Sequence, residues 1–94
     1  MSDPVDAPPT EAVRFMLDAE PDPGLLPRLL APFARRNLLP DRMWSHRGAT
    51  VVHVEIALDA APADCVPLVA GNLRQVVGVH CVTLLRCGNM RDAA

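Results

Sequence analysis

Residues 22–36 read DPGLLPRLLAPFARR, and this stretch decides the fold. Pro23 and Gly24 predict a turn, because proline presets φ and glycine tolerates backbone angles that other residues avoid. Apolar residues then recur at helical spacing and predict one buried stripe. The stripe consists of Leu25, Leu29 and Phe33, with Leu26 and Leu30 beside them. The stretch therefore predicts a turn that leads into an amphipathic helix.

The predicted helix runs from about Gly24 to Arg36. Pro32 lies inside it, and an interior proline removes a backbone hydrogen bond, so we expect a kink there or a break near Ala31. Asn37 follows the helix, at the position where many helices end with a residue in the left-handed conformation, and asparagine adopts this conformation readily.

Alternating or β-branched patterns predict four strands around two helices. The first strand covers Ala12–Ala19, the second Asp41–Arg47 and the third, which is the clearest, Thr50–Leu58. Asp59–Pro62 is a start signal for the second helix, because proline suits a first helical turn. Val79–Leu85 is apolar on both sides and predicts a well-buried last strand.

The order β-α-β-β-α-β predicts an α+β, ferredoxin-like fold, with a four-stranded antiparallel sheet and both helices on one face. Right-handed crossovers give the strand order 4-1-3-2, which leaves the second and fourth strands at the edges. The domain is expected over residues 12–86. Residues 1–11, with three prolines, are expected to be a disordered tail, and residues 87–94 a polar tail.

The composition narrows the function classes. The chain of 94 residues is 50% hydrophobic and 21% charged, with a net charge of −2, which predicts one globular domain. The scattered arginines and an aromatic fraction of 3% do not fit a nucleic-acid partner. No apolar run is long enough to span a membrane, so we expect a cytoplasmic protein. A domain this small buries little core, so self-association is also expected.

The turn and the second helical segment together resemble the ACT domain, and within that family the short small regulatory subunit of acetolactate synthase. The motifs are Asp22-Pro23-Gly24-Leu25-Leu26-Pro27-Arg28, Phe33-Ala34-Arg35-Arg36 and Asn72-Leu73-Arg74-Gln75-Val76-Val77-Gly78-Val79. The resemblance covers residues 12–86. It implies a non-catalytic module without a cofactor that forms a homodimer and modulates the large, thiamine-diphosphate-dependent catalytic subunit.

The resemblance also implies an amino-acid effector, held where the first turn meets the second strand of the partner. The implied effector contacts are Asp22, Gly24, Leu25 and Leu26, with Arg42, Met43 and Trp44 opposite. Pro21 and Leu39 occupy two positions at which valine-sensitive members carry asparagine, and neither offers a side-chain amide. The resemblance therefore leaves valine feedback open.

Other residue patterns carry weaker functional signals. His46, His53 and His80 are expected to face solvent. No cysteine or acid lies at metal-ligand spacing beside His53 and His80, so no metal site is predicted. Cys65 and Cys81 are expected to be small core residues, and Cys87 to be exposed. Trp44 is expected at an interface.

No catalytic constellation can be assembled from these residues, so no catalytic residue is predicted. Two other classes stay open: a free-standing amino-acid or small-molecule sensor that acts on another partner, and a small enzyme, because ferredoxin-like folds also host catalysis.

Overall fold

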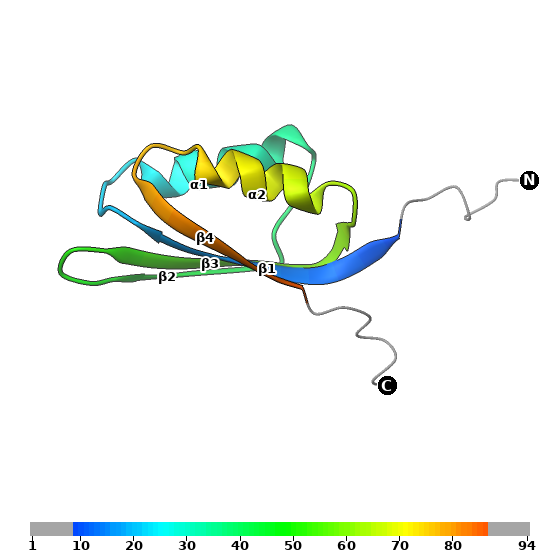
Figure 1. Ribbon diagram of the computed structural model, residues 1–94, viewed down its shortest axis with the longest axis horizontal. Coiled ribbons are helices and arrows are strands. Elements are labelled where there is room, and N and C mark those ends of the chain that lie inside the picture. The colour runs from blue at the N-terminus through cyan, green and yellow to red at the C-terminus, as the bar shows by residue number, and fades with distance from the viewer. Residues whose placement is uncertain (1–8, 87–94) are drawn as a thin grey trace, which may run out of the picture.

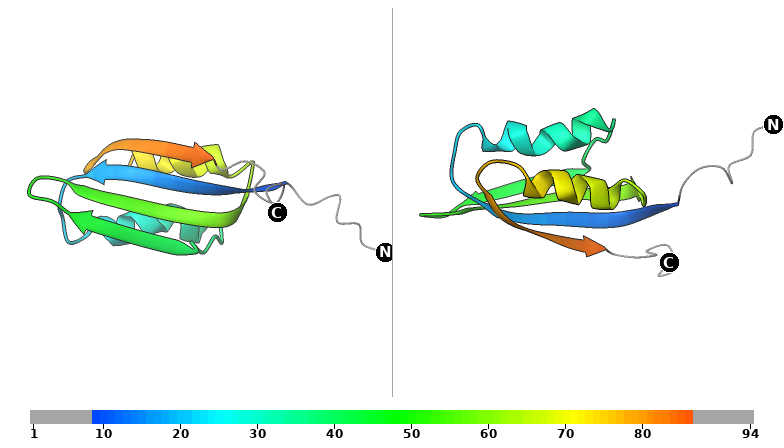
Figure 2. Two further views of the ribbon diagram at one scale, coloured as in Figure 1. Left: turned by 90° about the horizontal axis from the view of Figure 1, so that it is seen from below. Right: turned by 45° about the horizontal axis from the view of Figure 1, so that its top comes forward.

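The computed structural model describes residues 9–86, which form four strands and two helices (Figure 1). The elements are β1 (Thr10–Ala19), α1 (Leu25–Arg35), β2 (Arg42–Arg47), β3 (Val52–Pro62), α2 (Val66–Arg74) and β4 (Val79–Arg86). All strand pairs are antiparallel, in the order β2-β3-β1-β4. Figures 1 and 2 show both helices on one face of the sheet, while the other face is open. The predicted ferredoxin-like fold is confirmed.

The core lies between the sheet and the helices. The inward side chains of β1, which include Val13, Phe15 and Leu17, are almost fully buried, as are Leu29 and Phe33 of α1. The rings of Phe15 and Phe33 meet edge to face, with their centroids 5.4 Å apart, a geometry that aromatic quadrupoles favour. From the predicted apolar stripe, Leu25, Leu29 and Phe33 lie in this core, whereas Leu26, which was expected beside them, is exposed.

Helix α1 continues through Pro32, so the expected break near Ala31 is wrong. The Pro32 ring is buried with the core residues, and this packing offsets the missing hydrogen bond that proline causes in a helix. Asn37 has a φ of 60° just after the helix, which confirms the left-handed residue expected there.

The boundary between β3 and α2 differs from the prediction. Residues 59–62 do not begin a helix, because β3 continues to Pro62 and α2 begins at Val66. The pairing between β1 and β3 is longer than predicted. Strand β1 begins at Thr10, two residues before its predicted start, and Thr10 pairs with Pro62. Ala61 is buried at this end of the sheet, and its burial favours the strand over a helical turn.

Strand β4 is not well buried, which corrects a second expectation. It lies at the sheet edge, and its side chains on the open face, Cys81, Thr83 and Leu85, are exposed. Only Val79, Val82 and Leu84 pack partly against the core. The continuous run of apolar residues in β4 therefore does not indicate burial on both faces, because the strand lies at the sheet edge.

Two further expectations concern the ends of the chain and membranes. Most of the tail expected over residues 1–11 and the whole of the tail expected over residues 87–94 lie outside the described residues, as does Cys87. Within residues 9–86, no helix has the length and apolar character needed to cross a membrane.

Candidate functional site

The corner between β1 and α1 is held by the side chain of Asp22. Its Oδ2 atom accepts a hydrogen bond from the Gly24 N–H at 3.0 Å and one from Arg28 Nη2 at 2.9 Å. A β-carbon on Gly24 would lie 2.8 Å from Arg28 Nη1, so glycine gives the Asp22–Arg28 ion pair its room. The sequence Asp-Pro-Gly thus builds a braced turn at the start of the helix.

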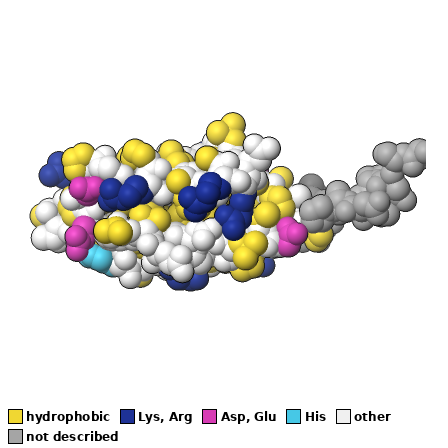
Figure 3. Space-filling model, turned by 90° about the horizontal axis from the view of Figure 1, so that it is seen from above, with side chains coloured by type: hydrophobic (Ala, Val, Ile, Leu, Met, Phe, Trp, Pro, Cys, Tyr) yellow, Lys and Arg dark blue, Asp and Glu magenta, His cyan; other side chains and the backbone are white. Residues whose placement is uncertain are grey.

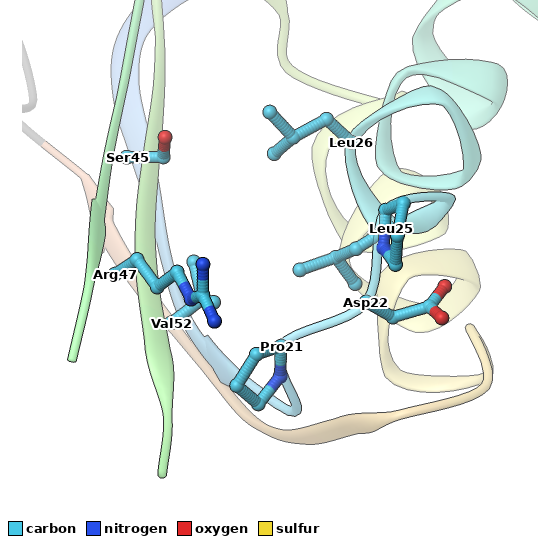
Figure 4. A pocket seen from close by; sticks show the side chains of 8 residues that line it. Pro21, Asp22, Leu25, Leu26, Ser45, Arg47 and Val52 are labelled. Carbon is cyan, nitrogen blue, oxygen red and sulfur yellow. The ribbon is translucent and has the colours of Figure 1, made fainter. Parts of the chain in front are cut away.

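A cavity of about 440 Å³ lies between this corner and the end of β2 (Figure 4). Its apolar lining comes mainly from the turn, the first residues of α1 and the start of β3. These apolar residues are Pro21, Pro23, Leu25, Leu26 and Val52, and the polar ones are Asp22, Ser45 and Arg47. Figure 4 shows Leu25 and Leu26 pointing toward β2, from which Ser45 and Arg47 extend toward the corner. A space of this kind fits a small molecule with an apolar part.

The two charged side chains of the cavity differ in their partners. Asp22 is engaged by Gly24 and Arg28, and in Figure 4 its carboxylate points away from β2. Arg47 is exposed and has no carboxylate within 4.0 Å among residues 9–86. The cavity therefore offers one guanidinium group that is free to bind an anion.

The predicted effector contacts divide into two groups. Asp22, Leu25 and Leu26 line the cavity, and Gly24 forms the turn beside it. Arg42, Met43 and Trp44 do not line it. Met43 packs against the core, while Arg42 and Trp44 lie opposite Ala57 and Glu55 on the open face of the sheet. Arg42 donates to Asp59 Oδ1 at 2.9 Å, and this contact raises the pKa of its guanidinium.

Five residues that line the cavity were not predicted from the sequence: Pro21, Pro23, Ser45, Arg47 and Val52. The sequence does contain a pattern that bears on Ser45 and Arg47. Because side chains alternate along a strand, these two residues lie on the face of β2 opposite to Trp44. Only the register, in which Arg47 pairs with Val52, shows that this face borders the corner.

The open face carries a row of polar side chains across all four strands. His46 pairs with His53, His53 with Asp18, and Asp18 with Cys81. All three histidines are exposed, as expected, and His53 Nδ1 contacts Asp18 Oδ1 on the neighbouring strand. His80 Nε2 likewise lies 3.4 Å from Glu20 Oε2. Cys81 is exposed, which corrects its expected place in the core.

This row does not form a catalytic or metal centre in the described part of the chain. The Cys81 thiol donates to Asp18 Oδ2 at 3.6 Å and not to a histidine, so Cys81 lacks the Cys–His pair that activates thiol nucleophiles. Within residues 9–86, no group of three or more His, Cys, Asp or Glu side chains could hold a metal ion.

The outer surface of the two helices also carries polar side chains and a groove. In Figure 3 arginine side chains gather over the helix layer. Arg36 Nη1 donates to Asn72 Oδ1 at 2.8 Å and so joins α1 to α2. A shallow groove of about 230 Å³ beside this contact includes Arg35 and Gln75 in its lining. It has less apolar lining than the corner cavity, which stays the better candidate for a ligand.

The sequence matches the model of the ACT-like domain family over residues 8–91. Among solved structures, it is similar to the ACT domain from the GTP pyrophosphokinase of Chlorobium tepidum. The TM-score is 0.69 at 13% identity, and the match covers 81% of this chain and 99% of that one. No curated protein matches the chain.

Proposed function

The chain belongs to the ACT-like domain family, and from this membership we propose that it is a non-catalytic regulatory module with a small-molecule effector. The observation that carries the proposal is the cavity between the β1–α1 corner and the end of β2. Its apolar lining and its free guanidinium group suit ligand binding, whereas no nucleophile–base pair accompanies them among residues 9–86.

The specific role that we propose is that of a small subunit of acetolactate synthase. The support is the resemblance of the Asp22–Arg28 turn and the Asn72–Val79 segment to that branch of the family. In this role the module binds the large catalytic subunit and stabilises its active form. An effector bound in the corner cavity then changes the affinity between the subunits, and by linkage the large subunit changes the affinity for the effector by the same factor.

A homodimer through β2 is part of the proposal. Strand β2 is an edge of the described sheet, and its unpaired backbone groups can extend the sheet into a second copy. The exposed Trp44 lies on this strand, and exposed tryptophans often anchor interfaces. We expect Trp44→Ala to weaken the dimer about tenfold in sedimentation equilibrium.

The matched control for the dimer is Leu85→Ala on the opposite edge strand. Leu85 is 45% exposed and also lies on the open face, so its loss leaves the β2 edge unchanged. Equal weakening by both substitutions, or a monomeric parent protein, contradicts a dimer seam at β2.

The experiment that tests the proposed role uses the purified chain and the acetolactate synthase large subunit of the same organism. Co-elution of the two proteins and a higher rate of acetolactate formation are expected, and an ACT domain of similar size from another enzyme serves as the control. If the two proteins do not associate and the rate is unchanged, the proposed partner is wrong.

The alternative is a free-standing sensor that acts on a different partner. It draws support from the structural neighbour, which is an ACT domain taken from a GTP pyrophosphokinase and thus from another kind of enzyme. Effector binding by the chain without any association with the large subunit favours this alternative.

A further inference from the structure

The two charged side chains of the corner cavity differ in whether they already have a partner of opposite charge. Arg47 is its one cationic side chain and is free of a carboxylate partner within residues 9–86. Asp22 is its one anionic side chain, and it is already bound by Gly24 and Arg28. An amino acid carries both a carboxylate and an ammonium group, but this cavity has a free charged partner for only one of them.

We propose that the ligand of the corner cavity is a small branched carboxylate without an α-ammonium group, such as a branched-chain fatty acid or 2-oxo acid. The proposal rests on the proposed function, because it takes the cavity to be the regulatory site and defines the chemical class of its effector.

The carboxylate end is assigned to Arg47 and Ser45. A guanidinium group presents parallel N–H donors that match the two oxygens of a carboxylate, and such charged hydrogen bonds are stronger than neutral ones. Both residues extend from β2 on the side that faces α1 (Figure 4), and the Ser45 hydroxyl can donate a further hydrogen bond.

The apolar end is assigned to the start of α1 and to β3. Leu25 and Val52 are nearly buried and form the inner wall, whereas Leu26 is 37% exposed and can cover a ligand from outside. Burial of a few branched methyl groups against these side chains adds to the affinity of the charged contact.

An ammonium group on the ligand is disfavoured by the same arrangement. It would lie near the Arg47 guanidinium, and like charges repel most strongly where water is partly excluded. The Asp22 carboxylate, which could balance it, points away from β2 and is held in the turn. To face the cavity, this carboxylate would have to turn out of the contacts that its Oδ2 atom makes with Gly24 and Arg28.

Titration calorimetry on the full chain tests the proposal with compounds that share one branched alkyl group. The compounds are 3-methylbutanoate (carboxylate only), 3-methyl-2-oxobutanoate (carboxylate and oxo group), valine (carboxylate and ammonium) and 2-methylpropylamine (ammonium only). We expect both acids without nitrogen to bind about tenfold tighter than valine, and the amine not to bind.

Arg47→Gln tests the assigned residue, and Arg35→Gln is its matched control. Arg35 is likewise exposed and lacks a carboxylate partner within residues 9–86, but it lies beside the helix groove. We expect Arg47→Gln to weaken 3-methylbutanoate binding at least tenfold and Arg35→Gln to leave it unchanged. Circular dichroism of both variants verifies that the fold is intact.

Three results would overturn the inference, and they separate it from the proposed function. Valine binding as tightly as 3-methylbutanoate rejects the ligand class but keeps an effector site. Equal losses in the two variants reject the role of Arg47. No heat with any of the four compounds up to about 10 mM rejects the ligand class, and the effector site of the proposed function is rejected as well only if the other amino acids also give no heat.

Discussion

The two β-to-α corners hold equivalent places in the two βαβ halves of the molecule, yet they differ in what they leave open. The first corner, at Asp22, borders the cavity of about 440 Å³. At the second, the Ala63 N–H donates to the Pro9 carbonyl at 2.8 Å and the Cys65 N–H to the Pro62 carbonyl at 3.0 Å. Equivalent backbone hydrogen bonds brace the first corner, from the Glu20 N–H to the Gly78 carbonyl at 2.9 Å and from the Leu25 N–H to the Asp22 carbonyl at 3.0 Å. The difference between the two corners therefore lies in their side chains and not in their backbone contacts.

The same difference applies to the arginine that ends each facing strand. Arg47 ends β2 and lies opposite the core residue Val52, while Arg86 ends β4 and lies opposite the core residue Val13. Arg86 donates to Glu11 at 3.0 Å, whereas Arg47 has no such partner within residues 9–86. One half of this repeated fold thus pairs its strand-end arginine with a carboxylate of the same chain, while the other leaves its arginine without a carboxylate partner among the described residues.

The largest effect is expected at the wall of the first corner. Leu25→Ala removes a side chain that is 2% exposed and leaves a cavity, so the free energy of unfolding should fall by about 2–5 kcal/mol. Urea denaturation measures it. Leu26→Ala, next in sequence but more exposed, should cost less than about 1 kcal/mol and still weaken ligand binding. Equal stability losses would contradict this division of the two leucines.

The next effect concerns the loop that backs the first corner. Gly78 has a φ of 94°, and its carbonyl accepts the Glu20 N–H at 2.9 Å. Gly78→Ala should lower the free energy of unfolding by about 1–2 kcal/mol, because other L-residues are strained at this angle. Its control, Gly71→Ala in α2, has no atom within 4 Å of the added carbon and should stabilise the protein by about 1 kcal/mol. Thermal denaturation distinguishes the two outcomes.

A smaller effect separates the two strand-end arginines. Arg86→Gln breaks the contact with the mostly buried Glu11 side chain and should cost about 1 kcal/mol in the free energy of unfolding. Arg47→Gln should change it by less than about 0.5 kcal/mol. The two variants are compared by urea denaturation at low salt. A larger loss for Arg47→Gln would mean that Arg47 has a structural role.

The smallest effect is expected from the acids of the two turns. Asp22→Ala removes the acceptor of two hydrogen bonds, but at an exposed site, and should cost about 0.5–1 kcal/mol. Asp64→Ala, at the exposed second turn, should lower the free energy of unfolding by about 0.3 kcal/mol, because only the interaction with the dipole of α2 is lost. Equal losses, again by urea denaturation, would show that the hydrogen bonds of Asp22 add nothing.

The sequence patterns predicted the type and order of all six elements, and from them the strand order. They failed where a local signal competed with the pairing of strands far apart in the sequence. Residues 59–62 carry a helix start signal, but the pairing of Thr10 with Pro62 keeps them in a strand. The apolar β4 reads as buried, yet its position at the edge is a property of the whole sheet.

The candidate site was predictable on its turn side only. Asp22, Leu25 and Leu26 follow from the Asp-Pro-Gly turn and the helical stripe that begins there. Arg47 could not be assigned, because its place at the corner depends on the register between β2 and β3, which no local pattern encodes.

The most direct test of an effector site at only one corner is an NMR titration of the ¹⁵N-labelled chain with 3-methylbutanoate. The account predicts amide shift changes at residues 22–26 and 45–52, with residues 62–66 unchanged. Changes centred on residues 62–66, or no change at any concentration up to 10 mM, would contradict it.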